Sequence, residues 1–279
     1  MTDPTPHLGR TAVVTGAGSG IGQAISQRAA SLGMNVVLAD VDPARLEAAV
    51  THVRTAGGAA IGVVTDVSDA DSVDRLAEAA YGEFGSVDVL VNNAGVESVG
   101  YIWDMTPAAW TRVQRVNADG VFHGIRAFVP RMGADQRPSH VINIASVAAI
   151  ATGTLNAAYF ASKHAVLAMT ECLHLEAAER FPQLKVSVVC PGAVTTQIFA
   201  DAAAVRAEGD GGASMQMLDA LRGHLAHNGI TPEDAASTIL DHLDRDGFWI
   251  QTHPDDFAAF AGRRATMLAD QTPPPPPLM

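Results

Sequence analysis

The sequence predicts an α/β protein, a single domain in which one doubly wound parallel sheet of seven strands has helices on both faces. Three observations predict this class. Seven short apolar runs rich in β-branched residues recur along the chain, longer Ala-rich segments separate them, and the runs are continuously apolar rather than alternating. Strands that read this way are covered on both faces, which is typical of parallel sheets. The regular alternation of strand and helix indicates a doubly wound fold.

The predicted elements follow one another in a regular order. Each apolar run is short enough for a strand, and each intervening segment has the Ala content and the length of a helix. The expected strands are 11–15, 35–39, 60–64, 87–91, 140–145, 185–190 and 248–251, and the expected helices are 21–32, 43–56, 69–84, 107–132 and 157–180.

One domain over residues 9–255 accounts for this alternation, after a flexible N-terminus at residues 1–8. Between 197 and 230 the chain is rich in Ala, Gly, Asp and Met with weak periodicity, so we expect a mobile substrate loop or lid there. Residues 256–279 form a C-terminal extension. Its proline run at 273–277 predicts an exposed, disordered polyproline tail, with a docking segment or a subunit contact as the alternative.

Composition limits the class of protein. The chain has 279 residues, 48% apolar and 17% charged, which is ample material for a large core. Its formal net charge of −12 repels nucleic-acid phosphate and anionic lipid, so neither partner is expected. Two cysteines are too few for a disulfide scaffold, and the sequence carries no leader-like or membrane-length apolar run. A cytoplasmic location is therefore expected.

A glycine-rich turn, Thr15-Gly16-Ala17-Gly18-Ser19-Gly20-Ile21-Gly22, follows the first expected strand and leads into an apolar helix. Glycines let backbone N–H groups approach a diphosphate, and the helix N-terminus adds partial positive charge. Asp40 ends the next strand, about 20 residues further on, where a carboxylate can accept hydrogen bonds from both hydroxyls of an adenosine ribose. Because Asp40 repels a 2′-phosphate and its neighbours supply no cation, NAD is favoured over NADP. Capping of the helix that starts near Pro43 is the alternative role of Asp40.

Three further loops follow expected strands at the same edge of the sheet. Asp66 and Val67 can contact an adenine ring, and the turn Asn92-Asn93-Ala94-Gly95 suits a tight approach to a ligand. Pro191-Gly192 ends the sixth strand abruptly, and Thr196 can grip a nicotinamide amide. Ordinary turn chemistry explains each loop equally well when it is taken alone.

Tyr159 and Lys163 are four residues apart on an expected helix, so they lie on one face, about 6 Å apart along the axis. A phenol of pKa about 10 becomes a base near neutral pH when its phenolate is stabilised by ~4 kcal/mol. One ammonium at about 4 Å supplies a similar amount at an effective dielectric constant of about 20. The pair can act as a general base, although a surface pair has the same spacing.

Two polar residues complete this candidate centre. Ser146 ends the fifth expected strand at its carboxyl edge, and its hydroxyl can bond a substrate oxygen shared with Tyr159. Asn117 lies inside the expected helix 107–132, a poor place for an amide without a partner, and it can hold a water that passes protons to Lys163. A routine cap is the alternative for Ser146.

Together these motifs resemble the short-chain dehydrogenase/reductase family in its single-domain branch. The resemblance implies a Rossmann-like fold in which Tyr159 is the general acid/base and Lys163 lowers its pKa and holds the nicotinamide ribose. It also implies that Ser146 orients the substrate oxygen and that Asn117 completes a proton relay. The cofactor contacts that it implies are Gly16, Ser19, Gly20, Ile21, Gly22, Asp40, Asp66, Val67, Asn93, Ala94, Gly95, Tyr159, Lys163, Pro191, Gly192, Val194 and Thr196.

The implied activity is hydride transfer between NAD and a secondary alcohol or ketone, by a homo-oligomer, a tetramer or dimer, packed through helices 107–132 and 157–180. The expected pocket edges are mostly apolar apart from Glu97, Ser98 and Asn156, which favours a hydrophobic, cyclic, terpenoid-like or steroid-like substrate. The alternatives are a catalytically weak NAD-binding regulator or scaffold, and a ketone reductase that uses NADPH. No metal is expected, because the ten histidines fall in no ligand pattern.

Overall fold

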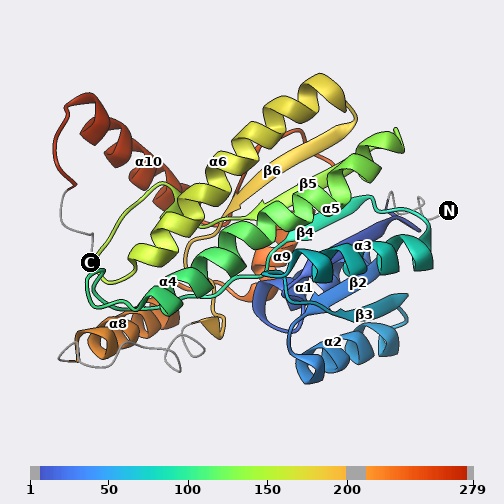
Figure 1. Cartoon of the computed structure of the whole chain (residues 1–279), viewed down its shortest axis with the longest axis horizontal. Coiled ribbons are helices and arrows are strands. Elements are labelled where there is room, and N and C mark those ends of the chain that lie inside the picture. The colour runs from blue at the N-terminus through green and yellow to red at the C-terminus, as the bar shows by residue number, and fades with distance from the viewer. Residues whose placement is uncertain (1–6, 199–211, 275–279) are drawn as a thin grey trace.

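A computed structural model describes residues 7–198 and 212–274 and contains the predicted seven-stranded sheet (Figure 1). Every strand pair is parallel, in the order β3-β2-β1-β4-β5-β6-β7. The connections diverge at β1 and β4, and doubly wound folds bind ligands beyond the carboxyl ends of such strands. The strands are β1 (Thr11–Thr15), β2 (Asn35–Asp40), β3 (Ala60–Val64), β4 (Val89–Asn92), β5 (Ser139–Ile144), β6 (Leu184–Cys190) and β7 (Trp249–Gln251).

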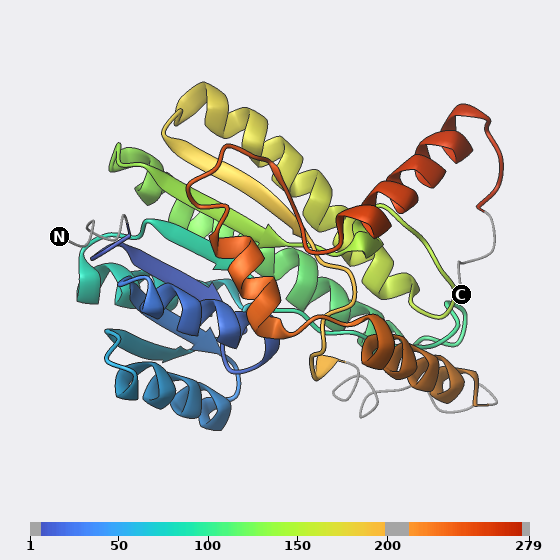
Figure 2. The same ribbon diagram turned by 180° about the vertical axis from the view of Figure 1, so that it is seen from behind.

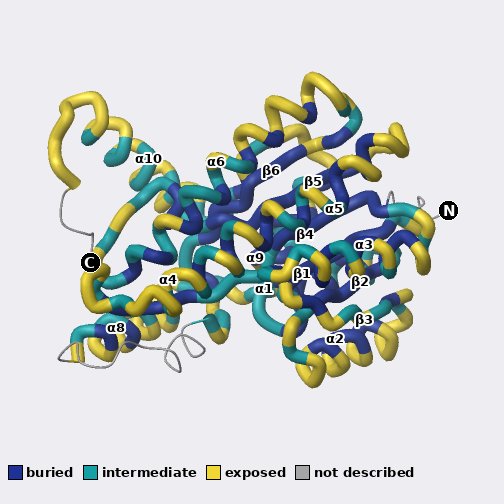
Figure 3. The backbone as a smooth tube through the Cα atoms, viewed as in Figure 1, coloured by how far each residue is buried: buried dark blue, intermediate teal, exposed yellow. Residues whose placement is uncertain are grey.

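Helices cover both faces of the sheet, as the apolar strands predict. One core cluster joins the sheet to α1, α2 and α9, and another joins it to α3, α5 and α6. Figure 2 shows the face that carries α1 and α9, and Figure 3 shows the buried strands between the two layers. The helices are α1 (Gly20–Ser31), α2 (Pro43–Thr55), α3 (Ala70–Phe84), α4 (Pro107–Gln114), α5 (Gly120–Ala134), α6 (Ala157–Arg180), α8 (Ala213–Asn228), α9 (Pro232–Leu240) and α10 (Pro254–Ala269).

The predicted helix 107–132 is not continuous, and this prediction is corrected. A π-helical segment, η1 (Arg115–Asp119), separates α4 from α5. A π-turn is a rare irregularity of a single turn, and the prediction of one helix assumes a regular α-helical period throughout, so it does not reveal this segment. Asn117 lies in this segment, and π-bulges are frequent at functional sites.

The region predicted as a loop, 197–230, contains the helix α8, which is a second correction. Residues 199–211 of that region lie outside the described residues. The periodicity is weak because α8 buries only Ser214 and Leu218, so most of its positions are free to be small or polar. The role of this region as a lid stays a prediction.

The C-terminal extension forms α10 over much of its length, where the sequence predicts no helix. None of its residues is fully buried, and it extends from the body of the domain in both views (Figures 1 and 2). This exposure explains why the helix lacks a strong apolar stripe. The predicted proline tail lies largely outside the described residues, as does most of the predicted flexible N-terminus. No helix in the described part of the chain is long and apolar enough to cross a membrane.

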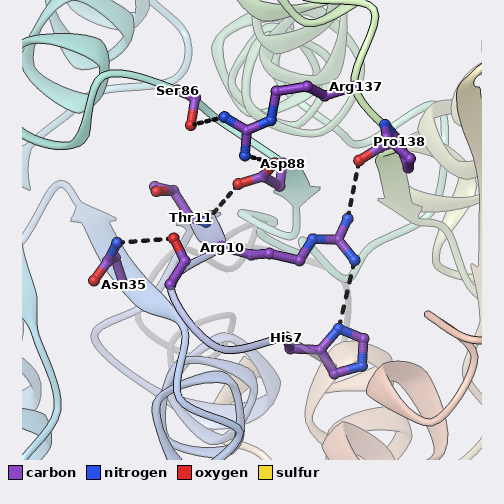
Figure 4. Close-up of polar contacts among 9 residues, drawn as sticks. His7, Arg10, Thr11, Asn35, Ser86, Asp88, Arg137 and Pro138 are labelled. Atoms are coloured by element: carbon purple, nitrogen blue, oxygen red, sulfur yellow. Dashed lines mark hydrogen bonds and ion pairs between the residues drawn. The ribbon is translucent and has the colours of Figure 1, made fainter. Parts of the chain in front are cut away.

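Polar side chains tie together the amino ends of the strands (Figure 4). Asp88, just before β4, accepts hydrogen bonds from the backbone N–H of Thr11 at 2.8 Å and from the Arg137 guanidinium at 2.6 Å. Arg10, just before β1, donates to the carbonyl of Pro138 at 3.1 Å. Side chains therefore link β1, β4 and the approach to β5 at the edge opposite to the predicted site.

Candidate active site

The glycine turn between β1 and α1 allows close approach of a ligand. Gly16 and Gly20 have positive φ angles of 64° and 53°, which other residues rarely adopt. A Cβ on Gly22 would collide with the Gly16 carbonyl, so the helix packs directly on the turn. No side chain caps the N-terminus of α1, and its first turn holds no acidic residue. Its backbone N–H groups therefore remain available to an anion.

Asp40 ends β2 beside this turn. Its carboxylate accepts hydrogen bonds from the N–H groups of Gly18 at 2.8 Å and Asp42 at 3.0 Å. The cap of α2 is Asp42, which accepts from the N–H groups of Ala44 and Arg45, so capping is not the role of Asp40. The structure also brings Arg45 to the cavity wall, where it forms a 3.5 Å ion pair with Asp42. This cation was not predicted from the sequence, because Arg45 lies beyond the immediate neighbours of Asp40.

The loop after β4 is fastened to the glycine turn. Asn93 Nδ2 donates to the carbonyls of Thr15 at 2.9 Å and Gly16 at 3.2 Å. The Thr15 hydroxyl oxygen in turn accepts from the N–H groups of Asn93 at 3.0 Å and Ala94 at 3.1 Å. Asn93 therefore braces the turn, and its direct contact with a cofactor stays a prediction. Thr15 is a central residue whose structural role the sequence motif does not reveal.

Two other predicted loops lie at the same edge. Asp66 accepts from the N–H of Ser68 at 2.9 Å, as a turn-forming Asp does, and Val67 beside it is buried. The loop after β6 reaches the glycine turn, because a Cβ on Gly20 would lie 3.2 Å from Thr196 Cγ2. The loops after β1, β3, β4 and β6 therefore converge.

Tyr159 and Lys163 meet on one face of α6, as their spacing predicts. Lys163 Nζ lies 5.6 Å from the centroid of the Tyr159 ring and donates to the carbonyl of Ile144, the last residue of β5, at 2.9 Å. Ser146 follows β5 and lies close enough that its hydrogen bond lowers the pKa of Tyr159. The Ser146 hydroxyl oxygen also accepts a hydrogen bond from Ala148 N–H at 3.1 Å and so caps a short 3₁₀ turn. Ser146 therefore has the capping role as well as its position beside Tyr159.

Burial dominates the titration of this centre. It raises the pKa of the Tyr159 phenol, and the charge of Glu97 raises that pKa further. Burial also lowers the pKa of Lys163 to about 8, and Glu97 acts in the opposite direction when it is ionised. A lysine with this pKa exchanges its proton near physiological pH. The charge of Glu97 therefore bears on both reacting groups.

Asn117 is fully buried, and its amide is occupied within the protein. Its Oδ1 accepts from Val96 N–H at 2.8 Å, while its Nδ2 donates to the Val96 carbonyl at 2.9 Å and to the Ser162 hydroxyl at 3.0 Å. Ser162 donates to the carbonyl of Tyr159 at 2.8 Å. Asn117 thus connects the loop after β4 to the helical turn that carries Tyr159. A proton relay through Asn117 stays a prediction.

A cavity of about 1240 Å³ joins these groups. Every predicted catalytic and cofactor-binding residue lines it except Gly22 and Asn117, which lie directly behind lining residues. Away from Tyr159 the wall is largely apolar. Its apolar members include Ala148, Ile150, Leu155, Phe160, Met217, Leu221, Leu225, Phe260 and Met267.

The sequence matches the profile of the family described as short chain dehydrogenase over residues 10–206. The chain belongs to the short-chain dehydrogenase/reductase family. It is an oxidoreductase of that family, as the resemblance predicts.

Relatives of this short-chain dehydrogenase/reductase span most of its length. A 1-deoxy-11-beta-hydroxypentalenate dehydrogenase from Streptomyces exfoliatus is 37% identical over 248 residues, 88% of this chain and 84% of that protein. A 3beta-hydroxysteroid dehydrogenase 1 from Eggerthella lenta is 40% identical over 196 residues, 69% of this chain and 74% of that protein. A crystal structure of a short chain dehydrogenase/reductase from Burkholderia phymatum in complex with NAD has a TM-score of 0.92 and 37% identity, covering 98% of this chain and 99% of that one.

Some residues in the cavity wall of this short-chain dehydrogenase/reductase belong to a helix that the sequence did not predict. Helix α10 contributes Asp256, Phe260, Arg263, Arg264 and Met267. Their spacing places them on one face of a helix, and that spacing is the signal that could have predicted both the helix and its orientation. Among the described residues, no group of three or more His, Cys, Asp or Glu side chains gathers to hold a metal ion.

Proposed function

We propose that this short-chain dehydrogenase/reductase transfers hydride between NAD and a secondary alcohol or ketone carried on a hydrophobic, cyclic body. One observation carries the proposal: Tyr159, Lys163 and Ser146 line the same cavity as the glycine turn and Asp40. The groups suited to proton transfer and the groups suited to a dinucleotide therefore face one space, beyond the carboxyl ends of the strands.

The residues at the glycine turn fit a nicotinamide dinucleotide. The bare glycines and the uncapped N-terminus of α1 suit the diphosphate, and the Asp40 carboxylate suits the hydroxyls of the adenosine ribose. When bound, the dinucleotide accepts or supplies the hydride. Asp40 favours NAD because a carboxylate repels a 2′-phosphate. Arg45, paired with Asp42, is the cation on which the NADPH alternative would depend.

The proton moves through Tyr159. During oxidation its phenolate takes the proton of the substrate hydroxyl, and during reduction the phenol returns that proton to the carbonyl oxygen. Ser146 holds the same oxygen by a hydrogen bond. Lys163 in its charged form stabilises the phenolate, because an ammonium nearby favours the negative form of the phenol. Asn117 holds the helical turn of Tyr159 in place through Ser162.

The apolar wall supports a hydrophobic substrate. Helices α8 and α10 add aliphatic and aromatic side chains to the cavity wall, beside the charged side chains of α10, and these apolar side chains suit a fused or bulky ring system. The names of the two curated relatives, a hydroxypentalenate dehydrogenase and a hydroxysteroid dehydrogenase, support the same class.

The proposal extends to a homo-oligomer, a dimer or tetramer. Large apolar side chains are exposed on the helices through which the family resemblance implies packing, namely Trp110 on α4, Phe122 on α5 and Leu175 on α6. An interface through α4, α5 and α6 would cover these three side chains. Sedimentation of the purified chain checks this part, and a monomer at micromolar concentration contradicts it.

The test of the proposed activity is NADH formation from NAD with a panel of cyclic secondary alcohols, repeated with NADP. We expect turnover with bulky ring alcohols and a clear preference for NAD. Tight NAD binding without turnover of any alcohol or ketone would instead support the binding-protein alternative. Equal use of NADP would contradict the role given to Asp40.

A further inference from the structure

We propose that Glu97 and Asn156 form a second polar subsite in the cavity, which binds a hydroxyl group of the substrate other than the one that reacts. The preferred substrates are then diols in the direction of oxidation and hydroxyketones in the direction of reduction. This inference rests on the proposed function and specifies its substrate class.

Glu97 is a carboxyl group buried at the reacting centre. It lies in the loop after β4, is only 3% exposed, and lines the cavity together with Tyr159 and Lys163. One hydrogen bond reaches it from the described residues, donated by Asn156 Nδ2 to Glu97 Oε1. A buried carboxyl group with a single partner is costly to the fold, which indicates that a further partner arrives with a ligand.

The carboxyl group of Glu97 is a hydrogen-bond donor near neutral pH. Burial raises its pKa to about 8, and the hydrogen bond from Asn156 and the charge of Lys163 only partly oppose this. Because Oε1 accepts from Asn156, the proton resides on Oε2, which then has a hydroxyl to donate. A neutral Glu97 also does not oppose the phenolate form of Tyr159.

Asn156 supplies the matching acceptor. Its Oδ1 is buried and has no hydrogen-bond partner among the described residues. Asn156 occupies the N-cap position of α6, yet its side chain makes no capping hydrogen bond, although Asn is a preferred cap. Its amide is directed to Glu97 instead. One donor and one acceptor are therefore left side by side, and a hydroxyl group is the ligand group that accepts from the first and donates to the second.

A purely structural role does not account for the pair. The loop after β4 is already joined to the start of α6 by the backbone, because Gly100 N–H donates to the Leu155 carbonyl at 2.7 Å and Gly100 pairs with Asn156 as a parallel bridge. Two apolar side chains would hold the same contact without an unpartnered amide oxygen. Asn156 lies one helical turn before Tyr159, which places the second hydroxyl within a few bonds of the reacting carbon.

Matched ring alcohols test the inference. The probes are cyclohexanol and the cis and trans isomers of cyclohexane-1,2-diol, 1,3-diol and 1,4-diol, compared by kcat/KM and by dissociation constant from the enzyme–NADH complex. At least one diol should exceed cyclohexanol by about tenfold in one of these measures. The binding measurement, read from the fluorescence of bound NADH, is independent of turnover. Failure of the proposed function therefore appears as no NAD reduction, and failure of this inference appears as equal binding of diol and monoalcohol.

Variants identify the residues responsible. Glu97→Gln retains an acceptor for Asn156 and an N–H donor for the ligand, so it should keep the diol preference within about threefold. Glu97→Leu should abolish the preference, so that the ratio of diol to cyclohexanol falls to about one in both kcat/KM and binding. Ser98→Ala is the matched control, because the Ser98 hydroxyl is equally buried and has no partner within 7–198 and 212–274, but Ser98 does not line the cavity. It should keep the preference.

Two results overturn the inference. One is a panel in which no diol exceeds cyclohexanol by threefold in either measure. The other is a diol preference that survives Glu97→Leu. Should that variant fail to fold, Asn156→Ala decides instead, since it removes the acceptor and the partner of Glu97 together, and a retained preference in Asn156→Ala overturns the inference.

Discussion

Buried ionisable groups have different surroundings at the amino ends of the strands, here called the amino edge, and at their carboxyl ends, the carboxyl edge. At the amino edge the carboxylate of Asp88, whose side chain is 3% exposed, is held by Thr11 N–H and by Arg137. At the carboxyl edge Tyr159, Lys163 and Glu97 have pKa values displaced by burial and face a cavity. The first arrangement holds strands together, and the second keeps groups available to a ligand. Burial alone therefore does not mark a functional group, and a buried group with incomplete partners is a better candidate where it also lines a cavity.

The largest expected effect comes from removing the lysine ammonium group at the carboxyl edge, compared with removing a lysine ammonium group at the amino edge. In Lys163→Met, kcat should fall by about 10³-fold, because a nearby ammonium stabilises the phenolate by ~4 kcal/mol. The control is Lys185→Met, which removes the other lysine of the chain, half-exposed and paired with Asp246 at the amino end of β6. That variant should keep its kcat within about twofold. Steady-state rates of both variants on one substrate make the comparison, and equal losses would contradict it.

The preference for NAD over NADP tests whether Asp40 belongs to a cofactor site at the carboxyl edge. Asp40→Ala should lower the preference for NAD over NADP by about 50-fold, because it removes the acceptor of two ribose hydrogen bonds and the charge that repels a 2′-phosphate. The measured quantity is the ratio of kcat/KM values for the two cofactors. Asp69→Ala is the control, since Asp69 caps α3 and does not line the cavity, and it should leave the ratio within about threefold. An unchanged ratio in Asp40→Ala would remove Asp40 from the cofactor site.

At the amino edge the expected effect is on stability alone. Asp88→Ala leaves the N–H of Thr11 buried without its acceptor and should cost about 2 kcal/mol, which lowers Tm by roughly 4–8 °C. Asp88→Asn retains an acceptor oxygen and should lose less. Thermal unfolding is measured beside the activity per folded molecule, which should not change in either variant. A loss of kcat without a loss of Tm would refute the division between the edges.

The effect that is smallest near neutral pH is the pH dependence of stability from His140, near the amino end of β5. Burial lowers its pKa from 6.5 to about 3, so the unfolded chain binds a proton below pH 6.5 that the folded chain does not. Stability is therefore lost as pH falls from 6.5 toward 3, with a slope of up to about 1.4 kcal/mol per pH unit. Denaturant midpoints against pH measure this slope, which should be shallower in His140→Gln. Parallel curves for the two proteins would count against it.

The sequence predicts the sheet well because its strands are buried on both faces. Residues such as Val13 and Leu90 are apolar because helices cover both faces of their strands, and they are fully buried. The predicted seven-stranded parallel sheet is confirmed. The start of α2 is determined by adjacent residues, since Asp42 provides the cap and Pro43 is the first helical residue. The convergence of Ser146, Tyr159 and Lys163 follows from the fold once the strands are placed. Their catalytic roles stay predictions.

The rest depends on contacts that a linear pattern does not contain. The π-helical segment at Asn117 is an irregularity of one turn, which the apolar pattern of the surrounding helix does not predict. Helix α8 buries two residues and α10 buries none, so burial gives neither sequence a strong apolar stripe, although the residues of α10 that line the cavity share one face. The meeting of Gly18 with Asp40 and Arg45, and the position of Glu97 near the charge of Lys163, arise only when separate loops pack together. Tertiary packing decides each of these features.

The central claim is that chemistry takes place at the carboxyl edge with Tyr159 as the proton donor and acceptor. The most direct test is the rate of NADH formation by Tyr159→Phe in a single turnover, measured with NAD affinity and Tm on the same preparation. We predict a loss of about 10³-fold or more in rate, with NAD affinity within about threefold and Tm within about 2 °C of the unsubstituted protein. A rate within about tenfold of the unsubstituted protein would contradict the claim and assign proton transfer to another group.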